Sequence, residues 1–165
     1  MKNLIKVILV VILFAGYSQV QAQDKKLVSA TSFNIVLPQS TFSDTYDHGF
    51  GVYANIDYNF NKVLAARFDL GWNDVSGPEK IIADANGDLH YVNPNMSVWE
   101  FTAGLRAKFS IFYIEGRAGY FSGINKFGYV PAVGLKFGKL DIQGNYTFIE
   151  VGETEWAAIR VAYYW

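Results

Sequence analysis

The stretch "GFGVYANIDYNF", residues 49–60, alternates between polar or small side chains and apolar ones along its whole length. Every second residue from Phe50 to Phe60 is apolar, and the intervening positions hold glycine, tyrosine, asparagine and aspartate. Successive side chains of a β-strand point to opposite faces, so this alternation predicts a strand with one apolar and one polar face.

The same alternation recurs to the end of the chain. It predicts further strands over about residues 64–72, 99–109, 112–120, 129–137, 140–148 and 158–165, and a weaker one over 27–37. Charges of one strand share a face, as Arg67 does with Asp69 and Glu100 with Arg106. The sequence therefore predicts an all-β protein with eight strands, each apolar on one face and polar or charged on the other.

The predicted connections alternate in length. Tight turns near Asn61-Lys62, Ser110-Ile111 and Gly138-Lys139 contrast with longer links over about residues 38–47, 74–97, 121–127 and 149–155. Short turns on one side and long loops on the other are typical of outer-membrane barrels, in which the short turns face the periplasm. An even strand number then predicts that both termini are periplasmic.

The longest link, residues 74–97, contains Asn86-Gly87 between two short apolar-polar stretches. This dipeptide is a strong signal for a two-residue hairpin. We expect the third and fourth strands to continue outside the membrane and to turn there.

The N-terminus indicates secretion. Lys2 and Lys6 precede an apolar run over residues 7–16, and the small-residue site Val20-Gln21-Ala22 follows. This pattern predicts a cleaved signal peptide over residues 1–22 and a mature barrel domain over 23–165. The run is shorter than the ~20 residues that a membrane-spanning helix needs. The alternative, an N-terminal membrane anchor, is less favoured.

Composition excludes several classes of protein. Charged residues make up 18% of the chain and hydrophobic ones 51%, and there is no cysteine for a lipid anchor, a disulfide or a thiolate-metal site. Without Lys2 and Lys6 the mature chain is acidic by about three charges, which gives no basic excess for nucleic acid. No mature apolar stretch reaches the length of a spanning helix, so a membrane form must be a closed sheet.

The tight turns predict which polar residues face each other inside such a barrel. If Phe60 faces Leu64, Phe109 faces Phe112 and Phe137 faces Leu140, each hairpin aligns one pair of opposite charges. The predicted interior ion pairs are Asp57 with Arg67, Arg106 with Glu115, and Lys136 with Asp141. An isolated charge is costly to bury, so we interpret these pairs as a structural filling of the barrel rather than a proton path or selectivity ring.

Aromatic residues are predicted at the membrane interfaces. Trp72 and Trp99 fall at outer strand ends on the apolar face, and Tyr163 and Trp165 fall at the end of the last strand. We expect this last strand to pair with the first. Pro131 is a misfit on the apolar face, and a bulge near the rim is expected to accommodate it.

The whole mature chain resembles the small eight-stranded outer-membrane barrels of Gram-negative bacteria, including the OmpA-type and OmpX-type barrels and the "porin family". The resemblance rests on the strand pattern, the signal peptide and the last strand. It implies an eight-stranded antiparallel up-and-down transmembrane β-barrel in the cell outer membrane. Ile159, Val161, Tyr163 and Trp165 resemble the C-terminal signal that the outer-membrane assembly machinery reads.

The search for chemistry gives no catalytic, metal or cofactor site. Neither His48 nor His90 has a serine two residues away, which the lipid A deacylases of this fold carry. His48 lies near Ser43, Asp44 and Asp47, the residue types of palmitoyl-transferring barrels, but polar loops commonly contain them.

The stretch over residues 84–88 begins like a calcium loop, but it lacks the glycine and glutamate that an EF-hand requires further on. A hairpin tip is the favoured interpretation.

Four hypotheses remain open. The favoured one is a non-enzymatic outer-membrane barrel with a structural role or a surface-interaction role, chiefly through residues 74–97. The alternatives are a narrow channel or carrier of a small ligand, a lipid-modifying enzyme, and a soluble periplasmic barrel with its apolar face turned inward.

Overall fold

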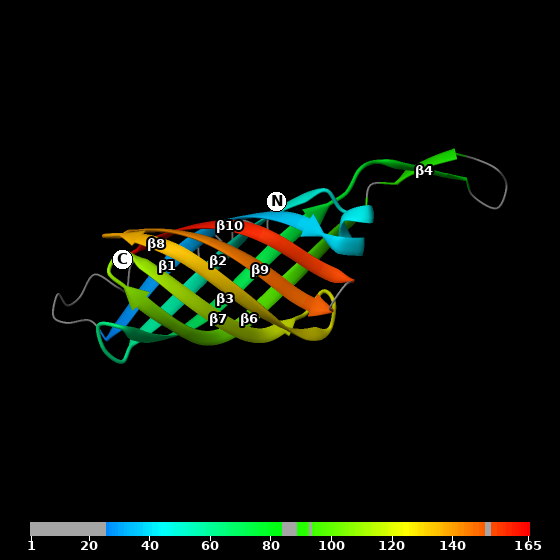
Figure 1. Cartoon of the computed structure of the whole chain (residues 1–165). Coiled ribbons are helices and arrows are strands. Elements are labelled where there is room, and N and C mark those ends of the chain that lie inside the picture. Colours follow the sequence, from blue (N-terminus) through cyan, green and yellow to red (C-terminus); the bar gives the residue numbers. More distant parts are fainter. Residues whose placement is uncertain (1–25, 84–88, 93, 151–152) are drawn as a thin grey trace.

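The computed structural model describes residues 26–83, 89–92, 94–150 and 153–165, and the predicted signal peptide lies outside them. The described chain is almost entirely β-structure, with one short 3₁₀ helix (Figure 1). The elements are β1 (Leu27–Gln39), η2 (Ser40–Asp44), β2 (His48–Asn59), β3 (Leu64–Ser76), β4 (Lys80–Ala83), β5 (Leu89–Val92), β6 (Asn95–Phe109), β7 (Phe112–Phe121), β8 (Lys126–Phe137), β9 (Leu140–Glu150) and β10 (Thr154–Tyr164).

Eight of these strands form one closed antiparallel barrel in the order β1-β10-β9-β8-β7-β6-β3-β2. Sequence neighbours pair throughout, apart from the β4–β5 excursion between β3 and β6. The last strand pairs with the first over ten residue positions, from Ala30 opposite Tyr164 to Gln39 opposite Glu155. The predicted eight-stranded up-and-down barrel, closed by its terminal strands, is confirmed.

Apolar side chains cover the outside of the barrel and polar ones fill the inside. Phe68 and Leu105 are 54% and 55% exposed, whereas their chain neighbours Arg67 and Arg106 are at most 1% exposed. A soluble protein does not expose a continuous apolar belt of this kind, because contact with water is unfavourable. Such a belt is favourable in contact with membrane hydrocarbon. The alternative of a soluble barrel with its apolar face turned inward is therefore wrong. Within the described residues, no helix is long and apolar enough to cross a membrane.

The two ends of the barrel differ. We name as the turn rim the end with the connections 60–63, 110–111 and 138–139, where the C-terminus also lies (Figure 1). We name the opposite end the loop rim. There, β4 and β5 form a separate two-stranded sheet that extends beyond the barrel. This confirms a hairpin within residues 74–97, although its tip at Asn86-Gly87 lies outside the described residues.

Two of the expected long links are shorter than predicted. β7 and β8 are separated only by residues 122–125, and β9 and β10 only by residues 151–153. The strands continue past the apolar belt because their backbone hydrogen bonds do not depend on contact with lipid. The hairpin and η2 are therefore the main structures at the loop rim.

An apolar cluster fills the inside of the barrel at the loop rim. The Trp156 side chain is fully buried there, and the rings of Phe42 and Phe121 each lie 5.8 Å from it between centroids. Phe42 comes from η2, which folds in over the barrel end. Val36, Val75, Val98 and Val130 complete this packing.

Pro131 lies on the outer face of β8, opposite Gly116 of β7. On its other side, the pairing with β9 is interrupted between Tyr129–Phe148 and Ala132–Asn145, and the register is the same before and after. The expected bulge is therefore wrong. The ladder is interrupted at the position where proline has no N–H to donate, and the strands resume without a shift.

Candidate functional site

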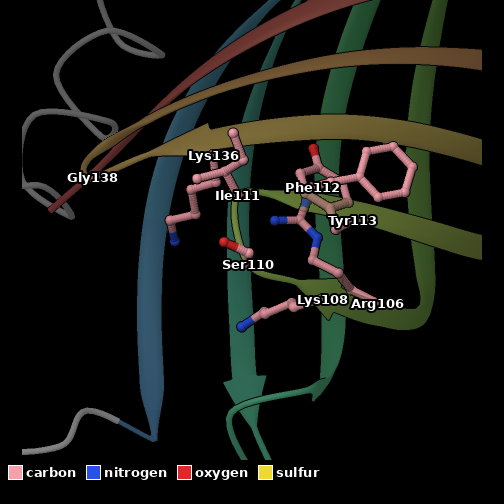
Figure 2. A pocket seen from close by; sticks show the side chains of 8 residues that line it. All are labelled: Arg106, Lys108, Ser110, Ile111, Phe112, Tyr113, Lys136 and Gly138. Carbon is pink, nitrogen blue, oxygen red and sulfur yellow. The ribbon is translucent and has the colours of Figure 1, made fainter.

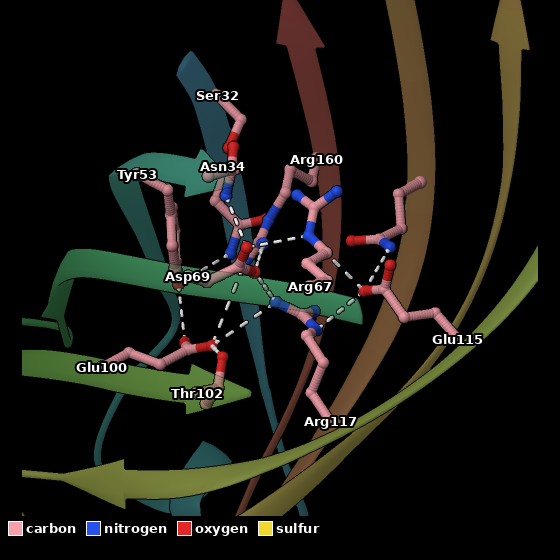
Figure 3. A network of polar contacts seen from close by, with 12 residues as sticks. Ser32, Asn34, Tyr53, Arg67, Asp69, Glu100, Thr102, Glu115, Arg117 and Arg160 are labelled. Atoms are coloured by element: carbon pink, nitrogen blue, oxygen red, sulfur yellow. Dashed lines mark hydrogen bonds and ion pairs between the residues drawn. The ribbon is translucent and has the colours of Figure 1, made fainter. Parts of the chain in front are cut away.

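The distinctive feature of the interior is a layer of buried charges at mid-barrel (Figure 3). The alternation of the strands points these side chains inward, and barrel closure brings distant strands together. Each of them is at most 5% exposed. The layer contains Asp57, Arg67, Asp69, Glu100, Arg106, Glu115, Arg117, Asp141 and Arg160.

Asp69 of β3 lies at the centre of this layer. Its Oδ1 accepts hydrogen bonds from Arg67 Nε and Asn55 Nδ2, both at 2.8 Å. Its Oδ2 accepts from Arg160 Nη1 at 2.5 Å and from Arg117 Nη1. One carboxylate thus serves three guanidinium groups from β3, β7 and β10.

Arg106 of β6 forms a second centre nearer the turn rim. Its Nε donates to Glu115 Oε2 at 2.6 Å, and its Nη1 donates to Asp141 Oδ2 at 2.9 Å and to the Tyr164 hydroxyl at 2.8 Å. The guanidinium carbon also lies 3.8 Å from the ring centroid of Tyr113. The Tyr164 hydroxyl donates to Asp57 Oδ2 at 2.7 Å and accepts from Arg67 Nη1 at 3.1 Å. Because Arg67 also donates to Asp69, Tyr164 connects the two centres.

The three predicted registers are present, with Asp57 opposite Arg67, Arg106 opposite Glu115 and Lys136 opposite Asp141. Arg67 Nη1 lies 3.5 Å from Asp57 Oδ1, and Arg106 Nε lies 2.6 Å from Glu115 Oε2.

The expected ion pair between Lys136 and Asp141 is not formed. Asp141 is occupied by Arg106 and by the Tyr113 hydroxyl, which donates to it at 2.5 Å. Lys136 Nζ lies instead 3.3 Å from the ring centroid of Tyr164, and no carboxylate of the described residues is within ion-pair distance of it.

Several central residues were absent from the predicted pairs. Asp69 and Glu100 are predicted to share a face with Arg67 and Arg106 but have no predicted partners, and Arg117 and Arg160 belong to none of the predicted pairs. The signal for Asp69 was its position two residues from Arg67 on the same face. Its contacts with Arg117 and Arg160 cross between strands that are not neighbours, and turn registers carry no information on such contacts.

The predicted interface aromatics lie on the outer face. Trp72 and Trp99 face each other across β3 and β6, in the half of the barrel nearer the loop rim. Tyr163 and Trp165 lie at the turn rim, with their rings 5.0 Å apart between centroids. Their contact with a membrane interface stays a prediction.

Among the described loop residues considered for catalysis, Ser43 and His48 do not pair with each other. His48 is exposed at the start of β2, and the Ser43 hydroxyl donates to the Ser40 carbonyl at 2.6 Å rather than to His48. The side chain of His90 and residues 84–88 lie outside the described part of the chain. In the part that is described, no group of His, Cys, Asp or Glu is placed to hold a metal ion.

The burial of the central arginines bears on transport. A water-filled path would leave the side chains along it accessible to water, whereas Arg67, Arg106, Arg117 and Arg160 are at most 2% exposed. The apolar cluster around Trp156 adds a second closed layer. An eight-stranded barrel has an interior just wide enough for its own side chains to fill. In this barrel, buried side chains fill the middle and the loop-rim end.

No family model matches this chain. A search of curated proteins also gave no match. The fold does match solved transmembrane barrels. A designed transmembrane β-barrel has 15% identity and a TM-score of 0.53, with 88% of this chain and 100% of the other covered.

A similar likeness is found to Ail, the attachment invasion locus protein of Yersinia pestis, solved in complex with the heparin analogue sucrose octasulfate. The identity is 12% and the TM-score 0.53, with 84% of this chain and 96% of that chain covered. The structure of Ail in a phospholipid bilayer nanodisc gives 13% identity and a TM-score of 0.50, with 84% and 99% covered. Identities this low establish the fold alone.

Proposed function

We propose that this chain is a non-enzymatic protein of the bacterial outer membrane, with a structural or surface-interaction role exerted at its loop rim. The observation that carries the proposal is the contrast between a filled barrel and a hairpin that extends beyond it (Figure 1). The barrel anchors the chain in lipid, and the β4–β5 hairpin extends away from it at the loop rim. In this orientation the turn rim faces the periplasm.

The type of partner can be narrowed from charge. The connections at the loop rim contain several carboxylates and a single lysine, Lys80. These connections are residues 40–47, 77–94, 122–125 and 151–153. Ail was solved with a polysulfated ligand, and an acidic rim would repel such a polyanion. We therefore favour a neutral or basic partner for this chain.

The last strand supports the proposed location in the outer membrane. Ile159, Val161 and Tyr163 are exposed on the outer face of β10, and the Trp165 amide donates to the Ser29 carbonyl at 3.1 Å. An apolar row of this kind would let the assembly machinery of the outer membrane recognise the strand before it pairs with β1.

Replacing residues 79–93 with a short Gly-Ser turn tests the surface role. We expect the variant to reach the outer membrane and to keep heat-modifiable migration, while surface phenotypes such as cell-to-cell or cell-to-matrix adhesion weaken. A shortened chain that retained every such phenotype would contradict a role for the hairpin.

Two measurements test the alternatives. Planar-bilayer recordings should show no steady channels, because buried arginines and the Trp156 cluster close the barrel; conductance of a defined size would support the channel. Lipid A mass spectra from cells with and without the protein should be identical, and a changed acyl pattern would support an enzyme.

A further inference from the structure

A cavity of about 180 Å³ opens at the turn rim, between β6, β7 and β8 and the turns 110–111 and 138–139 (Figure 2). Three cationic side chains line it: Arg106, Lys108 and Lys136. No acidic residue is part of its lining. In Figure 2 the amino groups of both lysines and the guanidinium of Arg106 point into the same space.

One nitrogen of Arg106 has nothing to bind. The Arg106 side chain is fully buried, and its Nη2 atom has no hydrogen-bond partner among the described residues. The other two nitrogens are occupied by Glu115, Asp141 and Tyr164. A buried charged donor without an acceptor is unfavourable. Because the guanidinium is inaccessible to water, it contributes positive charge beside the cavity rather than a direct contact with a ligand.

Neither lysine forms a direct ion pair with a carboxylate of the described residues, and the charges of Asp57 and Asp141 act on both lysines only from a greater distance. Lys108 Nζ donates to the neutral amide oxygen of Asn59, and Lys136 Nζ lies over the ring of Tyr164. The carboxylate that could have served Lys136, Asp141, is already shared by Arg106 and Tyr113.

The net charge of the interior side chains also indicates that positive charge is in excess at the cavity. The buried central layer has four arginines and five carboxylates, as enumerated above. Lys108 and Lys136 turn this deficit of one positive charge into an excess of one, and both lie at the turn rim. The uncompensated positive charge therefore belongs to the cavity.

The size of the cavity limits the ligand. A water molecule takes about 30 Å³ of liquid volume, so the space corresponds to about six waters. Pockets for drug-sized ligands have roughly 300–1,000 Å³. The Tyr113 hydroxyl is engaged with Asp141, which leaves the two lysine amino groups and the Ser110 hydroxyl as polar groups available to a ligand.

We propose that the turn-rim cavity binds a small oxyanion of the phosphate or carboxylate type, held by Lys108 and Lys136 beside the buried positive charge of Arg106. Charged donors form the strongest hydrogen bonds with such groups. Ile111 and Phe112 border the cavity and are 50% and 41% exposed on the side of the lipid. The oxyanion can thus come from solution or from a lipid headgroup at the membrane edge.

The test is a titration of inorganic phosphate into the full-length protein in nanodiscs of phosphatidylcholine, followed by NMR of the Ser110 and Gly138 amides, which lie at the cavity. We expect saturable shifts that sodium chloride at equal ionic strength does not reproduce. A second preparation with phosphatidylglycerol distinguishes the source. Amides already shifted there, and insensitive to added phosphate, identify a headgroup. An unchanged phosphate response identifies a free anion.

Variants assign the binding residues. Lys136→Gln and Lys108→Gln should each weaken phosphate binding about tenfold, which corresponds to the loss of one charged hydrogen bond. Lys139→Gln is the matched control, because Lys139 lies at the same rim over the Tyr163 ring and outside the cavity lining. Heat-modifiable migration establishes that each variant is folded, and each lysine variant tests the proposal separately if the other does not assemble.

Two results would overturn the proposal. One is the absence of a saturable phosphate response in phosphatidylcholine together with identical spectra in the two lipids. The other is a loss of affinity in Lys139→Gln as large as in the cavity variants, because binding would then depend on the general charge of the rim.

Discussion

At the scale of single residues, the interior is stabilised by shared carboxylates rather than by isolated pairs. Asp69 accepts from three arginines, and Arg106 binds two carboxylates and a tyrosine. A buried ion pair is stabilising only when its geometry is good and its remaining polar atoms are satisfied. Removing one member of such a layer therefore affects every neighbour that shared it.

Asp69→Asn should destabilise the barrel strongly. The substitution keeps the shape but leaves Arg67, Arg117 and Arg160 without their common counter-charge. The cost should be about 3–5 kcal/mol, the range for breaking a buried pair. Denaturant unfolding in detergent micelles, followed by gel migration, measures it.

Asp74→Asn is the matched control, since this aspartate accepts from Ser97 at the exposed loop rim. It should change stability by less than about 1 kcal/mol. Equal unfolding midpoints for the two variants would contradict a central role for Asp69.

At the scale of strands, most of the fold could be predicted because alternation is a local signal. The face of each side chain follows from its own strand, so the sequence predicts the correct faces for Phe50, Asp57 and Arg67. Contacts between strands that are not neighbours depend on how the barrel is staggered. The hairpin register therefore predicts a pair of Lys136 with Asp141, but it gives no information on Arg106, which reaches Asp141 from across the interior.

A charge on the lipid face should be tolerated poorly. Leu105→Arg places a guanidinium in the apolar belt of β6, where the cost is about 2–4 kcal/mol at the bilayer midplane and falls toward the rims. Ile81→Arg is the matched control, because Ile81 is 57% exposed on β4, outside the barrel. Folding yield into lipid vesicles should decrease for the first variant only, and normal insertion of Leu105→Arg would contradict the membrane orientation.

The interrupted pairing at Pro131 predicts a stabilising substitution. Pro131→Val supplies an N–H where the ladder to β9 is open, and valine suits an outward-facing strand position. We expect a gain of about 0.5–1.5 kcal/mol, the net value of one hydrogen bond. Val133→Ala, on the same face, serves as the comparison and should not stabilise. A lower unfolding midpoint for Pro131→Val would show that the proline fits its site better than the open ladder implies.

At the scale of the whole molecule, barrel and hairpin are separate structures. β4 and β5 pair only with each other, and the barrel closes without them. The closed eight-stranded barrel could be predicted from the sequence. The cationic character of the turn-rim cavity could not be predicted. It arises because Arg106 and Tyr113 occupy Asp141, which leaves Lys136 without a carboxylate.

Barrel stability should therefore be independent of the hairpin. Replacing residues 79–93 with a Gly-Ser turn should change the free energy of unfolding by less than about 1 kcal/mol, since shortening a loop has a small entropic effect. Denaturant unfolding of both chains in the same micelles measures the difference. A loss of several kcal/mol would show that the hairpin supports the barrel.

The shared carboxylate of Asp69 also constrains how the chain can enter a bilayer. Arg160, one of its partners, lies 91 positions later in the sequence. It belongs to β10, the strand that closes the barrel by pairing with β1. An intermediate in which only some of the strands have paired would expose unpaired charged side chains to the acyl chains. Insertion and neutralisation are consequently expected to happen in one concerted event, without a stepwise addition of hairpins.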